Sequence, residues 1–158
     1  MSQAHHVVDD PVPTQNVCLA LDVSGSERSA VEHSFDGLAP LFAGVGGPRS
    51  ALWVVSPDIG GQTAVRFWAD VCRTGLGLAN PEPFPWCLAN AACGAVARRF
   101  GITGPNTTLL GMDDALAAAW KAANRGLAQG RFDTAVLIEL VLAADGAGAA
   151  RLRAWRLG

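Results

Sequence analysis

The sequence predicts an α/β domain with a mixed sheet of about five strands. Helical patterns occur at residues 89–100 and 113–129, and a nearly continuous apolar run at 134–143 is typical of a buried strand. Breaks rich in glycine and proline separate these segments. With 158 residues, the chain has the length of one domain. We therefore expect a flexible tail over residues 1–15 and a single domain over residues 16–158.

The first half of the chain alternates between strand and helix patterns. Apolar runs at 17–23 and 49–56 predict two strands. The segment that begins at Ser26 has apolar residues at helical spacing, and residues 62–74 show a second helical pattern. One side of this second helix carries Val65, Trp68, Ala69 and Cys72. These elements would support the helices and strands of the second half.

Residues 78–86 contain three prolines and cannot form a regular helix or strand. This segment would place the rings of Phe84 and Trp86 against a hydrophobic surface. We interpret both rings as covers of the domain's own core in preference to an intermolecular contact. The helix that follows is rich in small residues between Ala91 and Ala95, which would let another backbone approach closely.

The end of the chain predicts a β-hairpin. Apolar runs at 134–143 and 149–157 flank the turn sequence Asp-Gly-Ala-Gly at 145–148. In the second run, leucine and alanine alternate with Arg151, Arg153 and Arg156. We expect these arginines to form the solvated face of an edge strand, in preference to a nucleic-acid site.

The composition excludes several classes of function. Only 16% of the residues are charged and the net charge is −2, so the chain has no basic footprint for nucleic acid or for an anionic membrane. Half of the residues are apolar, which favours a buried partner surface. No segment has the pattern of a signal peptide or the length of a membrane span, and we expect a cytoplasmic protein.

The residue types that bind metals do not cluster in the sequence. The cysteines lack metal-ligand spacing, and we expect reduced, buried thiols at Cys18, Cys72, Cys87 and Cys93. His33 lies off the apolar stripe of its helix and fits a surface position. A polar tail explains the remaining candidates better than a weak metal site does, namely His5, His6, Asp9 and Asp10. We expect neither a metal nor a cofactor.

Four segments carry a resemblance to a known family. They are Phe84-Pro-Trp, Leu88-Ala-Asn-Ala-Ala, Arg99-Phe-Gly-Ile-Thr-Gly-Pro-Asn and Gly130-Arg-Phe-Asp-Thr-Ala. In this order they resemble the N-terminal half of β-ketoacyl synthases, the condensing enzymes of the thiolase superfamily. The resemblance implies a three-layer, thiolase-like half-fold. It also implies that the segment around Phe84 lies close to a dimer interface and a substrate entrance.

The same resemblance implies that the condensation chemistry is lost. In register, the cysteine nucleophile of the family falls on Asp113, and a shift of one residue would place Met112 or Asp114 there. Aspartate is a poor nucleophile for acyl transfer. The family takes its two active-site histidines from a C-terminal half, whereas the histidines of this chain all precede the matching region. Cys93 is not favoured as a substitute, because it lies among small residues with no histidine nearby.

The helix predicted at 113–129 begins with two carboxylates. Asp113 and Asp114 fit a helix N-terminus, where they offset the helix dipole, better than they fit an acid/base pair. The rest of the helix is rich in alanine, with Trp120 as its one large ring. In the thiolase fold a counterpart from the second half covers the corresponding helix. Without that half, an apolar helix face would be open to a partner.

Three hypotheses follow. The leading one is a non-catalytic, ketosynthase-like accessory subunit in fatty-acid or polyketide biosynthesis, which pairs with itself, with an active synthase or with an acyl carrier protein. The second is a small enzyme that uses Asp113 or Asp114 as acid/base in an acyl pocket lined by Trp86, Met112 and Trp120. The third is a stand-alone binder of acyl or polyketide products. The candidate binding or interface residues are Phe84, Trp86, Asn90, Met112, Asp113, Asp114 and Trp120.

Overall fold

The computed structural model describes residues 13–22, 26–111, 113–142 and 149–158. Its strands are β1 Gln15–Asp22, β2 Ser50–Ser56, β3 Asn106–Leu110, β4 Thr134–Leu142 and β5 Ala149–Leu157. Its helices are α1 Glu27–Leu38, α2 Gly61–Thr74, α3 Ala91–Phe100 and α4 Asp113–Ala128. Two short 3₁₀ helices are η1 Ala39–Phe42 and η2 Phe84–Cys87. The elements expected from the sequence are thus present, and β1 already begins at the last residue of the expected tail.

The described strands form one mixed sheet in the order β1-β5-β4-β2-β3. β2 pairs in parallel with β3 and β4, while β5 pairs antiparallel with β4 and with β1. The predicted pairing of the two hairpin strands is confirmed, although the turn at 145–148 lies outside the described residues. The α/β class and the mixed sheet of five strands are also confirmed.

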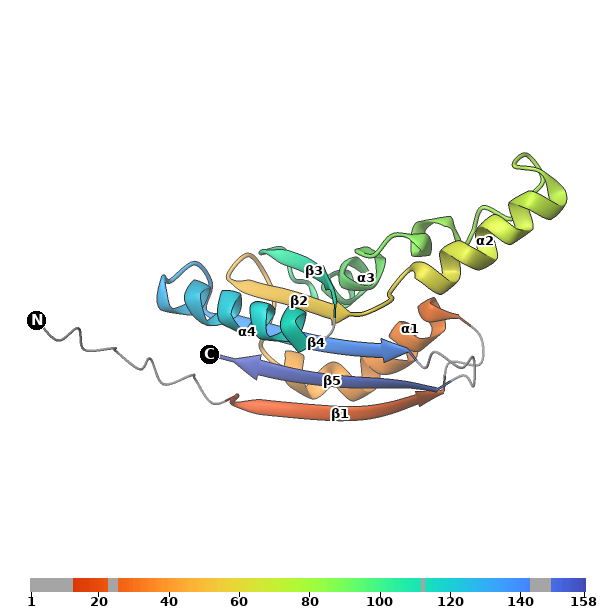
Figure 1. Ribbon diagram of the computed structural model, residues 1–158. Coiled ribbons are helices and arrows are strands. Elements are labelled where there is room, and N and C mark those ends of the chain that lie inside the picture. Colours follow the sequence, from red (N-terminus) through yellow and green to blue (C-terminus); the bar gives the residue numbers. More distant parts are fainter. Residues whose placement is uncertain (1–12, 23–25, 112, 143–148) are drawn as a thin grey trace, which may run out of the picture.

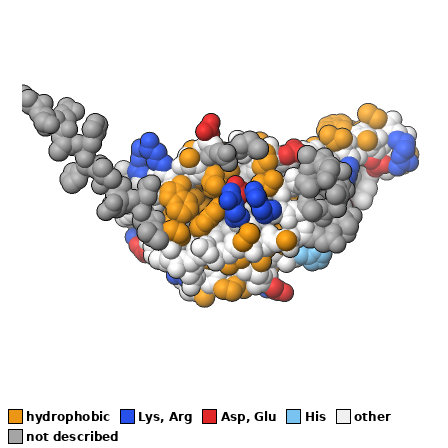
Figure 2. Space-filling view, turned by 60° about the horizontal axis from the view of Figure 1, so that its bottom comes forward, with side chains coloured by type: hydrophobic (Ala, Val, Ile, Leu, Met, Phe, Trp, Pro, Cys, Tyr) orange, Lys and Arg blue, Asp and Glu red, His pale blue; other side chains and the backbone are white. Residues whose placement is uncertain are grey.

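The prediction that β5 is an edge strand is wrong. β1 adds to its free side, with Cys18 opposite Arg153 and Ala20 opposite Arg151. The arginines also do not share a face, because side chains of a strand alternate and Arg156 is three residues from Arg153. Figure 2, in which the β1 edge is turned forward, shows basic side chains beside an acidic one and next to a hydrophobic patch.

Helices cover the two faces of the sheet differently. α1, η1 and α3 pack on one face, where they meet Leu52 and Val54 of β2. α4 packs on the other face, which carries Trp53 and Val55 of the same strand (Figure 1). β2 is buried along its whole length, as its uninterrupted apolar run predicts. This arrangement gives the three layers expected for the half-fold.

α4 approaches the sheet closely because its inner side is built from small residues. Ala119 and Ala123 are fully buried, and a Cβ added at Gly126 would lie 2.1 Å from the ring of Phe132. The opposite side of the helix, which includes Ala117 and other small residues, is exposed. The predicted apolar helix with an open face is therefore present among the described residues.

Gly104 positions the parallel strand β3. A Cβ at this residue would lie 2.2 Å from the backbone oxygen of Ser50 and 2.7 Å from that of Pro48. The next residue, Pro105, accepts a backbone hydrogen bond from Leu52 at 2.9 Å. Only glycine fits this close approach, so the Gly-Pro pair sets where β3 joins β2.

Candidate functional site

The segment from α2 to η2, residues 61–88, projects from the sheet, and we call it the arm (Figure 1). Within the described residues, seven large hydrophobic side chains are exposed, and only Leu110 among them lies outside the arm. The others are Val65, Trp68, Leu76, Leu78, Phe84 and Leu88. Leu78 is 83% exposed and Trp68 is 56% exposed. Such a concentration of exposed apolar surface is typical of interaction sites.

The apolar side of α2 that the sequence predicts faces solvent. Val65, Trp68, Ala69 and Cys72 are all exposed. The inner side of the helix is held by Phe67, whose ring centre lies 5.5 Å from that of Phe84. Phe84 remains 52% exposed, so it contacts its own chain while half of its surface stays open. Its expected role as a cover of the core is therefore only partly met.

Glu27 joins the arm to the body of the domain. This residue is 5% exposed, and its carboxylate accepts hydrogen bonds from the backbone N–H groups of Gly60 at 2.8 Å and Thr63 at 3.3 Å. Gly60 is the N-cap of α2 and has no side chain to serve the free N–H groups, so Glu27 replaces a capping side chain. Burial raises the pKa of Glu27 above its ordinary value, and the nearby charge of Asp58 acts in the same direction.

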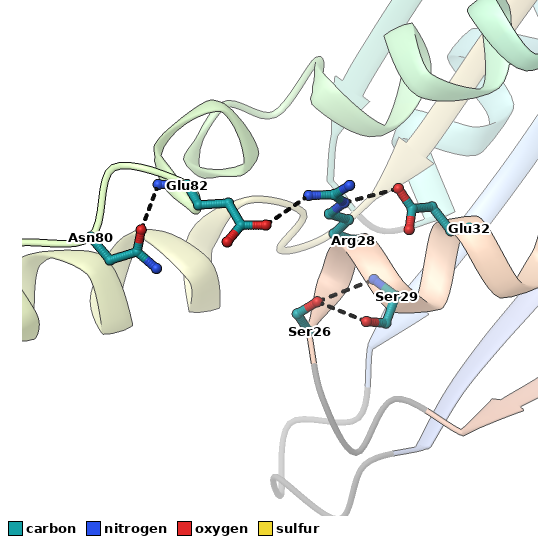
Figure 3. Close-up of polar contacts among 6 residues, drawn as sticks. All are labelled: Ser26, Arg28, Ser29, Glu32, Asn80 and Glu82. Carbon is teal, nitrogen blue, oxygen red and sulfur yellow. Dashed lines mark hydrogen bonds and ion pairs between the residues drawn. The ribbon is translucent and has the colours of Figure 1, made fainter.

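Arg28 makes a second, exposed tie between α1 and the arm (Figure 3). Its guanidinium donates to Glu32 at 2.9 Å within α1 and to Glu82 in the arm at 3.1 Å. The backbone N–H of Glu82 donates in turn to Asn80 at 3.0 Å. Exposed pairs of this kind contribute little stability, on the order of 0–1 kcal/mol. They connect the loop before η2 to α1.

Two hollows flank Trp86. One has a volume of about 210 Å³ and lies between α1 and the arm, beside Ser26 and Thr63. The other, which we call the α3 groove, has a volume of about 380 Å³ and runs from Leu88 and Asn90 to Arg98. A Cβ at Gly94, which lines this groove, would have no neighbour within 4 Å. The small residues of this helix therefore leave open space beside Gly94.

The structure separates the residues of the predicted acyl pocket. Trp86 packs against the core on the α1 and α3 side of the sheet, whereas Trp120 packs against the core on the α4 side. Trp120 instead meets Trp155, with ring centres 5.9 Å apart. Because the sheet lies between the two tryptophans, a single pocket lined by both is wrong.

The position at which the resemblance places the family's nucleophile lies at the start of α4. The helix begins at Asp113, as predicted, and Asp114 is exposed. Met112 and the side chain of Asp113 are outside the described residues. Their roles at this position remain predictions.

The buried cysteine, Cys93, is poorly suited to act as a nucleophile. Cys93 is buried and donates to the backbone oxygen of Thr107, and burial raises the pKa of its thiol to about 11. It is therefore protonated at neutral pH and a poor nucleophile. The expectation that all four thiols are buried is wrong for Cys18, on the edge strand β1, and for Cys72, on the outer side of α2, and Cys87 is only half-buried. His33 is exposed, as expected.

The part of the chain that the structure describes contains neither a cluster of metal ligands nor a helix that could span a membrane. In those residues, no three side chains of His, Cys, Asp or Glu lie close enough to hold a metal ion. The tail residues His5, His6, Asp9 and Asp10 are outside this part. Across the described ranges, no helix combines the length and the apolar character that crossing a bilayer requires.

The sequence pattern did not predict two contacts made by buried glutamates. From the sequence, Glu27 is predicted only to lie at the start of a helix. Its hydrogen bond to Gly60 has no local signal, because the two residues are 33 positions apart. Glu139 on β4 accepts two hydrogen bonds from Arg153 on β5, one of them at 2.8 Å. This second contact had a signal, because Glu139 is the one charge in an apolar strand and a hairpin places it opposite an arginine.

No family model and no curated protein matches the sequence. Solved structures do share its fold. The ishigamide ketosynthase/chain length factor superposes with a TM-score of 0.55 at 18% identity, over 70% of this chain and 37% of its own. The ketosynthase from module 1 of the bacillaene synthase of Bacillus amyloliquefaciens FZB42 superposes with a TM-score of 0.57 at 12% identity, over 87% of this chain and 31% of its own.

The predicted fold is thus confirmed: the chain has a ketosynthase-like half-fold of the thiolase type. It spans 31–37% of the length of these structures. At such identities the likeness concerns the fold alone.

Proposed function

We propose that this ketosynthase-like half-fold is a non-catalytic accessory subunit that binds a ketosynthase-type partner in polyketide or fatty-acid biosynthesis. The observation that carries the proposal is the arm, where large apolar side chains face solvent instead of the domain's own core. A domain that needed no partner would gain stability by burying Trp68 and Leu78, at roughly 25 cal/mol per Å² of apolar surface. Their exposure favours a role in binding.

The candidate catalytic groups support a role without condensation chemistry. The resemblance places Asp113 where the family has its nucleophile, and a carboxylate is a poor acyl-transfer nucleophile. Cys93 does not replace it, because its thiol is buried and has a pKa of about 11. The small-enzyme hypothesis also loses its pocket, since Trp86 and Trp120 lie on opposite faces of the sheet.

The partner surface that we propose has two parts. One is the exposed side of α2, and the other consists of Phe84 in η2 and the α3 groove, which begins at Pro85 and Leu88. A partner could lay an apolar surface on the arm and insert a chain segment into the groove. A ketosynthase is favoured because one structure with this fold is named as a ketosynthase/chain length factor. An acyl carrier protein is the competing partner.

The binder hypothesis has one observation in its favour. The α3 groove, at about 380 Å³, falls within the range of roughly 300–1,000 Å³ that is usual for ligand pockets. A stand-alone binder would retain an acyl or polyketide molecule without any protein partner. Native mass spectrometry of the purified chain would reveal such a ligand.

The test is the molar mass of the chain mixed with a ketosynthase from the same source, measured by light scattering. We expect a mixed complex for the wild type and its loss for Trp68→Glu. The matched control is Ala128→Glu, which places the same charge on an exposed alanine at the far end of α4. A mixture that never forms a complex, or a complex that both variants weaken equally, would refute the proposal.

A further inference from the structure

The α3 groove is formed by α3 and by the chain around η2, which pack against each other (Figure 1). Its floor is one side of α3, where the small residues Ala91, Gly94 and Ala95 follow one another at helical spacing. Its wall is the end of the arm, with the ring of Trp86 and the exposed side chain of Leu88. The groove thus offers apolar surface on two sides and lies open along Gly94.

Each end of the groove carries a polar side chain that its own chain does not use. Asn90 is the N-cap of α3, yet its side chain accepts no hydrogen bond from the helix, in contrast to the usual role of Asn at this position. Arg98 is exposed in the last turn of α3 and forms no hydrogen bond or ion pair with another described residue. The guanidinium of its neighbour Arg99 lies over the ring of Phe35 on α1 instead, 6.0 Å from the ring centre. Arg98 is therefore the cation that faces a ligand in the groove.

The charge at the Arg98 end favours an acidic group. None of the described residues that line the groove is Asp or Glu. The C-terminus of a helix carries a partial charge of about −0.5, which the two positive charges of Arg98 and Arg99 exceed. A hydrogen bond between a guanidinium and a carboxylate is also stronger than one between neutral groups.

The distance between the two polar ends sets the size of the occupant. Asn90 and Arg98 are eight positions apart, which corresponds to about 12 Å along a helix. An extended chain covers this length with about four residues. Sites for small molecules bury roughly 70–90% of their ligand. Because the floor at Gly94 is open, the groove suits a segment of protein better than a free acyl molecule.

We infer that the α3 groove binds an extended segment of about four residues, with an Asp or Glu side chain placed at Arg98. The segment belongs to the partner of the proposed function, on which this inference rests. A backbone amide of the segment bonds to the side chain of Asn90. An apolar side chain of the segment lies above Gly94, against the wall formed by Trp86 and Leu88.

The first test is the affinity of the complex with a ketosynthase from the same source, measured by calorimetric titration of full-chain variants. Arg98→Glu should weaken the complex at least about tenfold, because it sets a carboxylate against a carboxylate. Gly94→Leu should have a similar effect, since its side chain fills the groove. Arg99→Glu makes the same change of charge outside the groove and should weaken the complex less than about threefold.

Trp68→Glu separates the failure of this inference from that of the proposed function. If Trp68→Glu weakens the complex while Arg98→Glu and Gly94→Leu do not, the arm binds the ketosynthase and the segment in the groove is refuted. If no complex forms with the wild type, the proposed function is refuted. The second test then decides whether the groove accepts an acidic segment of any partner.

The second test uses the chain with two synthetic tetrapeptides, acetyl-Ala-Leu-Ala-Asp-amide and its Asn analogue, and needs no ketosynthase. NMR should show shifts of the Gly94 amide and the Trp86 indole with a millimolar Kd for the acidic peptide. Binding of the Asn analogue, and of the acidic peptide to Arg98→Glu, should be at least about fivefold weaker.

Three results of this titration would overturn the inference. They are the absence of shifts up to about 10 mM peptide, equal binding of the two peptides, and tighter binding of decanoate than of the acidic peptide. The last result would assign the groove to an acyl chain.

Discussion

The carboxylate of Glu27 accepts a hydrogen bond from the backbone N–H of Gly60 across 2.8 Å, and this bond fastens the arm to α1. The bond caps the N-terminus of α2, where the N-cap residue Gly60 has no side chain that could do so. The orientation of the apolar arm therefore depends on a buried side chain of another element. A change at Glu27 should loosen the arm without altering its exposed surface.

Glu27→Ala should lower the free energy of unfolding by about 1–2 kcal/mol, because it leaves the N–H groups of Gly60 and Thr63 without their partner. Denaturant titration would measure the loss. Glu32→Ala, which removes only an exposed partner of Arg28, should cost less than about 0.5 kcal/mol. Equal losses for the two variants would mean that Glu27 has no capping role.

The contribution of Glu27 should depend on pH. Burial raises its pKa above the ordinary value of 4.5. Its stabilisation is therefore complete below pH 4.5 and is lost as the pH rises through the raised pKa. The difference in stability between wild type and Glu27→Ala should shrink as the pH rises above 4.5. A difference that grows over this range would mean that the pKa is lowered instead.

The pair of Glu139 and Arg153 should behave in the opposite way. Hydrogen bonds from Arg153 lower the pKa of Glu139, so its stabilisation is present above the ordinary value of 4.5 and is lost as the pH falls through the lowered pKa. At neutral pH, Arg153→Met should cost about 2–3 kcal/mol, because it leaves the carboxylate of a side chain that is only 10% exposed without this partner.

Adding Glu139→Gln to Arg153→Met should recover much of this loss, because no unpaired charge remains. Thermal unfolding of the four proteins at neutral pH completes the double-mutant cycle. Additive losses would show that the two side chains are not coupled.

Gly104→Ala should be among the most damaging single changes in the chain. Its Cβ would lie 2.2 Å from the backbone oxygen of Ser50, and backbone cannot move aside as a side chain can. We expect a loss of at least about 2 kcal/mol, measured by denaturant titration. Gly94→Ala is the matched control, since open space surrounds it within α3, and it should stabilise by about 0.5–1 kcal/mol. A neutral Gly104→Ala would contradict the described junction of β2 and β3.

Asn124→Leu should leave stability unchanged or raise it by about 1 kcal/mol. Among the described residues, both polar atoms of the Asn124 side chain are buried without a hydrogen-bond partner. A leucine of similar size has no polar side-chain atoms that need a hydrogen-bond partner. A loss of more than about 1 kcal/mol in thermal unfolding would mean that the amide has a partner after all.

Local patterns predicted the elements, and long-range packing decided the rest. The apolar run of β2 and the helical spacing of α4 appear in the sequence because burial sets the residue type at each position. The pairing of β1 with β5 has no local signal, so β5 looked like an edge strand. For the same reason, the sequence did not show that the sheet separates Trp86 from Trp120, or that the apolar side of α2 faces solvent.

We propose that the arm is the surface that binds a ketosynthase. Amide hydrogen exchange of the chain, measured alone and with a ketosynthase from the same source, tests it most directly. The account predicts slower exchange at residues 61–88 in the mixture, with little change at β5. A complex that forms while exchange in the arm stays the same would contradict the account.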